Sequence, residues 1–472
     1  MLIGADASLF FNAADPGREL ARIISDQDAF RKAAETGWRY YRNENDIVSA
    51  GTRERVDRYY DRVIRNPLRN ADNAVPHPYH RILVDQKASY LFGKMMLIRS
   101  ENKEYNQYLQ ELSKNLYTQM LNVCVDASNT GVSYLHSYVS PEGKLTVVHI
   151  PSTEGIPLWG SSISRPLEGF IRYYSTQELN SSGQRILVKK AEVWTATDMT
   201  RYTLNGDRYL VSDDPASHFQ KSGNPLSFGV VPFAVFKNNE HCMSDLVNIK
   251  ELVDIYDKTV SLYSNDIEDL QELIFVLINY GGQDLEDFLT DLKQYKAVKV
   301  TRQGGGGDGG VETMKVDIPV EARIKLLNIL NKNIWNMGQG VDPEHTPNNV
   351  SGAALKHLYG LLELKASFTE TAFTNGLNAI LTLFKNWLCL SGKKDFRKEP
   401  EDIIYTRSMI SNDVEIVQMC IESKDIISDE TIVANHPWVD NPKAEIEKLT
   451  AQRIKKLEDE SRIYLGVVGD SE

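Results

Sequence analysis

The spacing of apolar residues changes from helical to alternating and back again along the chain. Up to Ala127, apolar side chains recur mostly at helical spacing. The predicted helical segments there are Asp26–Tyr41, Thr52–Ile64, His80–Phe92 and Asn106–Ala127. From Gly131 onward, apolar and polar residues alternate around turn residues, as in half-buried strands. Residues 131–237 are therefore predicted to form a mostly β module, with hairpins turning at Pro141–Gly143 and at Asn205-Gly206.

Two long helices are predicted on either side of a short insertion. Ser244 suits the N-cap of a helix over residues 244–271, because its hydroxyl can accept a hydrogen bond from a first-turn amide. Pro319 suits the first turn of a second helix, Val320–Met337, where its missing N–H has no intrahelical partner to lose.

The insertion, residues 272–319, is predicted to form a small unit of helix and strand. Its expected elements are a short acidic helix, Asp284–Leu292, and two strand-like runs, Ala297–Arg302 and Val311–Val316. The glycine-rich run Gly304–Gly310 lies between the two strand-like runs. A phosphate-binding loop would require a following Gly-Lys-Ser/Thr and a helix, and the sequence has neither, so a hairpin tip is favoured.

The second long helix is followed by a polar loop and then by the longest helical pattern in the chain. The loop is Gly338–Gly352, and the pattern runs from Ala353 to about Ser391 without a proline. A straight helix of that length would span ~57 Å, so we expect either a kink, at Gly376, or an elongated molecule. The last 80 residues are predicted to be helical and charged, ending in an amphipathic helix over Lys443–Arg462.

Composition places the chain among soluble globular proteins. Its 472 residues are 42% hydrophobic and 25% charged, which excludes a disordered, collagen-like or disulfide-rich protein and predicts about three domains. The net charge of −12 argues against a protein that coats DNA, since such proteins gather Lys and Arg. Four well-separated cysteines indicate a reducing compartment. We expect no signal peptide and no membrane span, because the longest apolar run, near Leu273–Ile278, is far too short.

Candidate chemical sites in the sequence are weak. His77 and His80 could bind a metal, but no converging third ligand is evident, and a capping or surface role is favoured. Acidic groups such as Asp266/Glu268/Asp269 and Glu286/Asp287 could serve a metal-dependent hydrolase, although a solvated helix face is the commoner origin of such groups. No serine-hydrolase, zinc-protease or nucleotide-binding motif is present in the sequence.

Charge is distributed unevenly among the segments. Residues 244–271 hold seven acidic and two basic side chains. Lys325, Lys332 and Lys356 flank the polar loop Gly338–Gly352. A second basic cluster precedes the glycine-rich run and comprises Lys293, Lys296, Lys299 and Arg302.

Four segments resemble the portal proteins of tailed double-stranded DNA bacteriophages, specifically the head–tail connector family of the siphovirus type. They follow the family's order and are Ile82–Lys94, Gly229–Lys258, Asn348–Ser367 and Lys424–Leu449. The resemblance implies an α+β, mainly α, portal fold with a wing, a two-helix stem, a small αβ clip, a tunnel loop on a long kinked helix and a helical crown. The implied regions are wing 1–243 with its β-rich part 131–237, stem helices 244–271 and 320–337, clip 272–319, tunnel loop 338–352, long wing helix 353–389 and crown 390–472.

The resemblance also implies a function without catalysis or cofactor. Portals are rings, usually of twelve subunits, at one capsid vertex. DNA passes through the ring without sequence recognition during packaging and ejection. The implied partners are the terminase large subunit, the head–tail adaptor, and the major capsid and scaffolding proteins, with no membrane. The implied location is the virion, with assembly in the host cytoplasm.

Site residues follow from these regions. We expect His345, Asn348 and Asn349 in the tunnel loop to approach DNA, and Lys325, Lys332 and Lys356 to set the local channel potential. An acidic channel wall would let DNA slide rather than stick. The cluster Lys293–Arg302 would contact terminase or adaptor. Two alternatives are another ring-forming connector component and the metal-dependent hydrolase.

Overall fold

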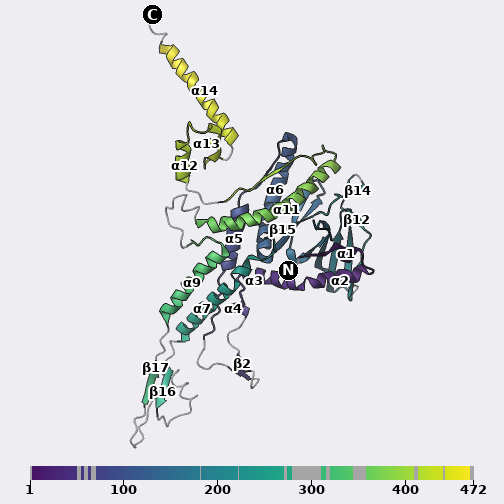
Figure 1. Cartoon of the computed structure of the whole chain (residues 1–472), viewed down its shortest axis with the longest axis vertical. Coiled ribbons are helices and arrows are strands. Elements are labelled where there is room, and N and C mark those ends of the chain that lie inside the picture. The colour runs from purple at the N-terminus through teal and green to yellow at the C-terminus, as the bar shows by residue number, and fades with distance from the viewer. Residues whose placement is uncertain are drawn as a thin grey trace, which may run out of the picture. The chain divides into compact units, whose positions relative to one another are not determined.

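The computed structural model describes most residues of the chain. They are 3–49, 55–57, 62–64, 71–180, 182–221, 223–269, 274–278, 310–314, 319–343, 358–408, 413–439 and 442–467. The chain forms two compact units. Unit 1 comprises residues 1–85, 122–339 and 372–398, and unit 2 comprises 86–121, 340–371 and 399–472. Helices and strands are both abundant, as predicted for an α+β protein (Figure 1).

Of the four N-terminal helices of unit 1, α1 and α2 begin at side-chain caps. The bounds of the four are α1 Ala7–Phe11, α2 Pro16–Asp26, α3 Asp28–Tyr41 and α4 Asp46–Ser49. Asp6 accepts a hydrogen bond from the Ser8 amide, and Asp15 accepts one from the Arg18 amide ahead of α2. Gly37 lets α3 approach the backbone at Asn129 unusually closely, because a Cβ at position 37 would lie 1.9 Å from the Asn129 carbonyl oxygen.

The large sheet of unit 1 has the strand order β1-β7-β8-β9-β10-β11, with β12 also paired to β10. The bounds are β1 Ala5–Asp6, β7 Gly155–Trp159, β8 Leu167–Leu179, β9 Arg185–Trp194, β10 Asp198–Asn205, β11 Arg208–Val211 and β12 Ala216–Ser217. Leu20, Ile23 and Ile24 of α2 pack into one core with apolar residues of this sheet, including Val193 and Tyr209. Burial of this apolar helix face accounts for the position of α2.

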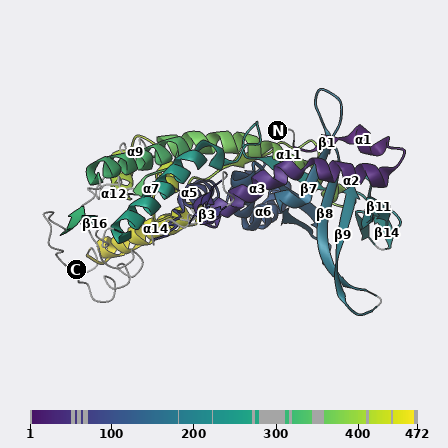
Figure 2. The same ribbon diagram turned by 90° about the horizontal axis from the view of Figure 1, so that it is seen from below.

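Strands β8 and β9 extend beyond their neighbours as a ribbon (Figure 2). Strand β7 pairs with β8 only as far as Arg172, and β10 pairs with β9 only from Lys190 onward. Over the rest of their length, β8 and β9 pair only with each other among the described residues. The end of the ribbon exposes Leu179 and Leu187.

A three-stranded sheet, ordered β15-β5-β6, lies in the same unit. Its strands are β5 Val132–Val139, β6 Leu145–Ile150 and β15 Phe233–Lys237, and the short hairpin β13 Phe219–Lys221 with β14 Asn224–Leu226 precedes β15. A 3₁₀ turn, Ser152–Glu154, follows β6. Phe30 and Ala34 of α3 pack against this sheet in a core that includes Tyr134 and Phe233.

Several predicted local structures were wrong or shifted. Thr52–Ile64 was expected to be helical, but its described residues form the paired strands β2 Arg55–Asp57 and β3 Arg62–Ile64. The second hairpin turns one residue later than predicted, because Asn205 pairs with Arg208 and Gly206 is the first loop residue, with φ of 65°. The apolar run after α7 is a strand, β16 Ile274–Ile278, which pairs with β17 Gly310–Met314.

The long helices are close to their predicted bounds. Ser244 does cap a helical segment, but first a 3₁₀ turn, Asp245–Asn248, and then α7 Lys250–Asp269 follow. Pro319 is the N-cap of α9 Val320–Gly338 rather than its first residue. Helix α11 runs over Gly360–Leu390, and residues 353–357 of the predicted pattern lie outside the described residues. Gly376 allows close packing, since a Cβ there would lie 2.7 Å from the Phe236 ring.

Unit 2 contains two strands and the C-terminal helices. The remaining elements are α5 Tyr79–Phe92, β4 Leu97–Arg99, α6 Lys103–Thr130, β18 Asp402–Ile404, α12 Asp413–Glu422, α13 Asp429–Asn435 and α14 Pro442–Val467. In this unit Arg407 binds Glu363 and Glu370 of α11, and the hydroxyl of Tyr90 also donates to Glu363. No side chain described between residues 416 and 457 is buried. Within the described residues, no helix combines the length and apolarity that a bilayer span requires.

We predict that His136 makes unit 1 sensitive to acid. Burial among the rings of Phe233 and Trp194 lowers the pKa of His136 to about 4, and its Nδ1 lies 3.1 Å from the Pro232 carbonyl oxygen. The unfolded chain would bind this proton near pH 6.5, so it holds more protons than the folded chain between pH 6.5 and 4. Stability should therefore fall over that window by up to about 3 kcal/mol.

The measurement is urea unfolding of the wild-type chain and of His136→Gln, which keeps an N–H donor but does not titrate. The difference in unfolding free energy between the two should shift in favour of the variant as the pH falls from 6.5 to 4. The exposed His241→Gln serves as the control. A pH-independent difference for His136→Gln would contradict the prediction.

Candidate functional site on two paired helices

Helices α7 and α9 form an antiparallel pair, as Figures 1 and 2 both show. Arg323 near the start of α9 binds Asp266 near the end of α7, with Nη2 and Oδ2 2.6 Å apart. At the other end, Ile334 and Trp335 share a core with Ile249 and Val253. These contacts at opposite ends fix the direction of the pair.

The segment 71–77, here called the strap, is bound along α7 by side chains rather than by a strand. The amides of Asn73, Val75 and His77 donate to the side chains of Asn265, Ser261 and Asp257, over 2.6, 3.0 and 3.0 Å respectively. The donors are two residues apart and the acceptors four. Two extended residues rise about 6.6 Å and four helical residues about 6.0 Å, so the two spacings match.

Asp257 is the most heavily used of these acceptors and is fully buried. Besides the His77 amide, it accepts from Asn45 Nδ2 over 2.6 Å and lies 2.8 Å from His77 Nδ1. A buried carboxylate requires such partners, because an unpaired charge in the interior is costly. His80 contacts a different residue, Asn129, over 2.8 Å. The two histidines that the sequence offered as possible metal ligands therefore have separate structural roles.

A second polar cluster holds the first turns of α7. Lys250 Nζ lies 2.7 Å from carboxylate oxygens of both Asp46 and Asp254, and the hydroxyl of Tyr40 donates to Asp254. Burial acts to lower the pKa of Lys250, but its hydrogen bonds to the two carboxylates raise it overall. Burial and the hydrogen bond to Asp254 raise the pKa of Tyr40. The cluster ties α7 to the N-terminal helices.

Much of the acidic excess predicted for this helix is therefore engaged in hydrogen bonds and ion pairs. Asp254, Asp257 and Asp266 bind Lys250, Asn45 and Arg323 respectively. Asp245 accepts from Asn238, and Glu268 accepts from Asn73. Most of the carboxylates counted in the sequence hold neighbouring segments in place.

The helices also expose apolar side chains, which sequence reasoning did not single out. Ile255 and Leu262, seven residues apart on α7, are 46% and 37% exposed, and Ile324 and Ile329 on α9 are 47% and 57% exposed. The sequence predicted an apolar stripe of Leu246, Ile249, Val253, Tyr256, Val260, Tyr263 and Ile267, of which Leu246, Ile249 and Val253 are buried and Ile267 is 50% exposed. The sequence did contain a signal for this second set of apolar residues, because the i, i+7 spacing of Ile255 and Leu262 places both on one face of the helix, apart from the buried face.

Only two of the residues predicted to be functional fall within the described residues. Lys325 and Lys332 are exposed on α9, two helical turns apart. His345, Asn348, Asn349 and Lys356 lie outside the described residues, as does the cluster Lys293, Lys296, Lys299 and Arg302.

The buried group Asp126, Ser133 and His149 resembles the residue set of a serine hydrolase but not its geometry. Asp126 Oδ2 and Ser133 Oγ lie 3.1 and 3.0 Å from the same nitrogen, His149 Nε2. In a catalytic triad the carboxylate and the hydroxyl contact different ring nitrogens. Asp126 also accepts from the Ser152 amide, so the group joins α6 to the β5–β6 hairpin. Among the described residues, no three His, Cys, Asp or Glu side chains are grouped to hold a metal ion.

The chain is similar to known proteins over nearly its whole length. The family model described as "Phage portal protein, SPP1 Gp6-like" matches residues 20–459. The portal protein of Clostridium phage phiCD119 is 36% identical over 452 residues, covering 93% of this chain and 96% of that protein. The portal protein of Bacillus phage SPP1 is 32% identical over 449 residues, covering 92% of this chain and 86% of that protein.

We predict that Asp257 is a large contributor to stability. Asp257→Ala leaves several buried donors without an acceptor, which should lower the free energy of unfolding by about 3 kcal/mol. Ser261→Ala removes one hydrogen bond and should cost about 1 kcal/mol. Denaturant midpoints provide the measurement, with Glu251→Ala, exposed on the same helix, as control. Equal midpoints for Asp257→Ala and Glu251→Ala would contradict the structural role of Asp257.

Proposed function

The chain belongs to the SPP1 Gp6-like family of phage portal proteins, and on that basis we propose that it forms a twelve-membered ring at one vertex of a phage head. Membership of this family implies an oligomeric ring in the capsid and a role as conduit for DNA packaging. The family is structural rather than enzymatic. The observation that supports the proposal most strongly is the match over residues 20–459.

The proposed regions follow the order of the chain. We assign α7 and α9 to the stem, residues 272–319 to the clip, 338–352 to the tunnel loop and 390–472 to the crown. The remaining residues, 1–243 and 353–389, form the wing. The antiparallel pairing of α7 and α9 supports this assignment, because both ends of the insertion then emerge at the same end of the pair.

The proposed partners act at different regions of the ring. The clip, with Lys293, Lys296, Lys299 and Arg302, is the docking surface for the terminase large subunit and then for the head–tail adaptor. The wing meets the major capsid and scaffolding proteins while the ring assembles in the host cytoplasm. Double-stranded DNA passes the tunnel loop, and Lys325, Lys332 and Lys356 moderate the channel potential.

Ring closure requires two different surfaces of one subunit to meet. The exposed apolar residues of α7 and α9 are suited to one of them, since isolated soluble surfaces rarely gather large apolar side chains on adjacent helices. The apolar surface favours a ring over the metal-dependent hydrolase, because Asp266 and Glu268 of its candidate acidic group already bind Arg323 and Asn73.

We predict that the apolar residues of α7 hold the ring together. The wild-type chain of 53.4 kDa should give a native mass of about 640 kDa and an annular image end-on. Ile255→Asn with Leu262→Asn should lose about 3 kcal/mol per interface and weaken assembly about a hundredfold.

The control is Glu251→Asn with Lys258→Asn, two exposed polar positions on the same helix. Native mass spectrometry over a range of concentrations distinguishes the two double variants. A wild-type chain that stays monomeric even with capsid and scaffolding proteins would contradict the proposed function. Rings that tolerate both double variants equally would contradict only the role of α7.

We predict a separate effect at the tunnel loop. Asn348→Ala with Asn349→Ala should reduce the retention of packaged DNA, because the amides that approach the phosphate backbone are lost. The measurement is the length and retention of DNA in filled heads, with Asn336→Ala on α9 as control. Unchanged length and retention would reject the assignment of these two asparagines.

A further inference from the structure

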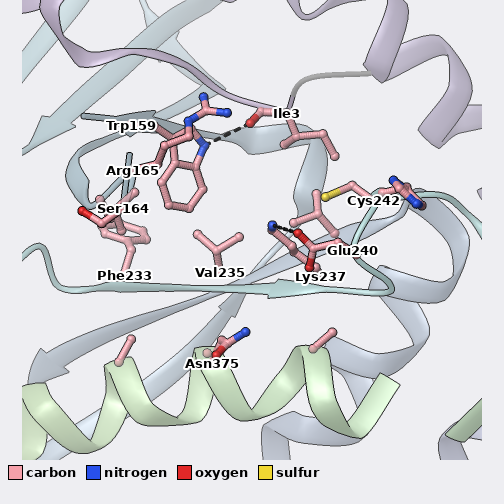
Figure 3. Close-up of a pocket in the computed structure, with 16 residues that line it drawn as sticks. Ile3, Trp159, Ser164, Arg165, Phe233, Val235, Lys237, Glu240, Cys242 and Asn375 are labelled. Atoms are coloured by element: carbon pink, nitrogen blue, oxygen red, sulfur yellow. Dashed lines mark hydrogen bonds and ion pairs between the residues drawn. The ribbon is translucent and has the colours of Figure 1, made fainter. Parts of the chain in front are cut away.

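Unit 1 contains a cavity of about 700 Å³ that the proposed ring does not yet explain. Figure 3 shows it between strand β15, which contributes Phe233 and Val235, and the end of β7 with the loop after it, which contribute Trp159 and Arg165. Its floor is α11, where the small residues Ala372, Gly376 and Ala379 and the polar Asn375 form the lining. Small residues on the floor and apolar residues on the walls leave room for a large apolar side chain.

Two basic side chains, Arg165 and Lys237, border this cavity. The one acidic lining residue, Glu240, lies 3.7 Å from Lys237, so Arg165 is the lining cation that forms no ion pair among the described residues. Arg165 and Cys242, at the border, have positive φ values of 42° and 52°. Strained backbone of this kind is concentrated at functional positions.

We propose that the cavity receives a large apolar side chain, flanked by carboxylates, from a second copy of this chain. The inference rests on the proposed ring and names one of its subunit contacts. Each copy has a net charge of −12, so identical copies repel one another unless their cationic surfaces meet acidic ones. A heterologous interface joins two different surfaces, and an apolar cavity bordered by Arg165 and Lys237 is one such surface.

The segment Asp425–Glu430 has the chemistry that this cavity would accept. Ile426 is 79% exposed and Ile427 44% exposed, and the carboxylates of Asp425 and Glu430 flank them on an exposed loop and helix start. The exposed Ile267 is a poorer match, because its neighbours Asp266 and Glu268 already bind Arg323 and Asn73.

The helices next to this segment also support Ile426 as the side chain that enters the cavity. The side chains described in α12, α13 and the first part of α14 include none that is buried. Helices of this length gain most of their stability from packing an apolar face. Contact with a neighbouring copy supplies that packing for Ile426.

The first test fills the cavity. Ala379 lines it from an exposed position on α11, so Ala379→Phe places a ring in the cavity without disturbing the core. Asn378→Phe adds the same ring at the adjacent exposed position, which does not line the cavity. We expect Ala379→Phe to reduce the fraction of rings at least tenfold and Asn378→Phe to leave it unchanged. Equal assembly of the two variants would overturn the proposal.

The second test exchanges charges and remains informative if a filled cavity alters folding. Arg165→Glu with Lys237→Glu should weaken assembly, and adding Asp425→Lys with Glu430→Lys should restore it. Asp429 is left in place because it lies 3.4 Å from Arg453. Assembly unaffected by the first pair would overturn the proposal, as would failure of the second pair to restore it. Absence of rings from the wild-type chain would instead contradict the proposed function on which the inference depends.

Discussion

The position of helix α7 depends on a match between two backbone spacings. Alternate amides of the strap meet every fourth side chain of the helix, so that Asp257, Ser261 and Asn265 each receive one amide. In a β-sheet, an extended segment forms hydrogen bonds with the backbone of a neighbouring strand. Here the side chains of a helix are the acceptors instead, and the strap is held without a sheet. The pairing of α7 with α9, and the exposure of the other helix faces, follow from this anchorage.

These hydrogen bonds also change the electrostatic effect expected from the acidic residues of α7. Residues 244–271 are strongly acidic, and the sequence suggested a repulsive wall. In the structure Asp254, Asp257 and Asp266 are acceptors for segments that must be held. A carboxylate bound in this way contributes less to the long-range field than one in solvent, since its charge is locally compensated or delocalised over donors.

Sequence reasoning located the long helices and the β module because their periodicity is strong. It missed β2 and β3, since Arg and Tyr at Thr52–Ile64 fit either structure and only the pairing of the two strands decides. It named Lys325 and Lys332 from their place beside a polar loop, and both are exposed on α9, while their role stays a prediction. It could not find the strap or the cavity, because these join residues more than 150 positions apart, such as His77 with Asp257 and Trp159 with Ala372. Charge counts likewise cannot separate a bound carboxylate from a free one.

The ribbon of β8 and β9 has a kinetic consequence. Beyond Arg172 and before Lys190 its two edges offer backbone groups that no other described strand pairs. Newly made subunits can therefore add strand to strand in an open-ended series, and this addition competes with closure of a finite ring. The exposed cationic side chains Arg185 and Lys189 oppose such addition by like-charge repulsion. Slower strand addition leaves more time for subunits to meet through the surfaces that close the ring.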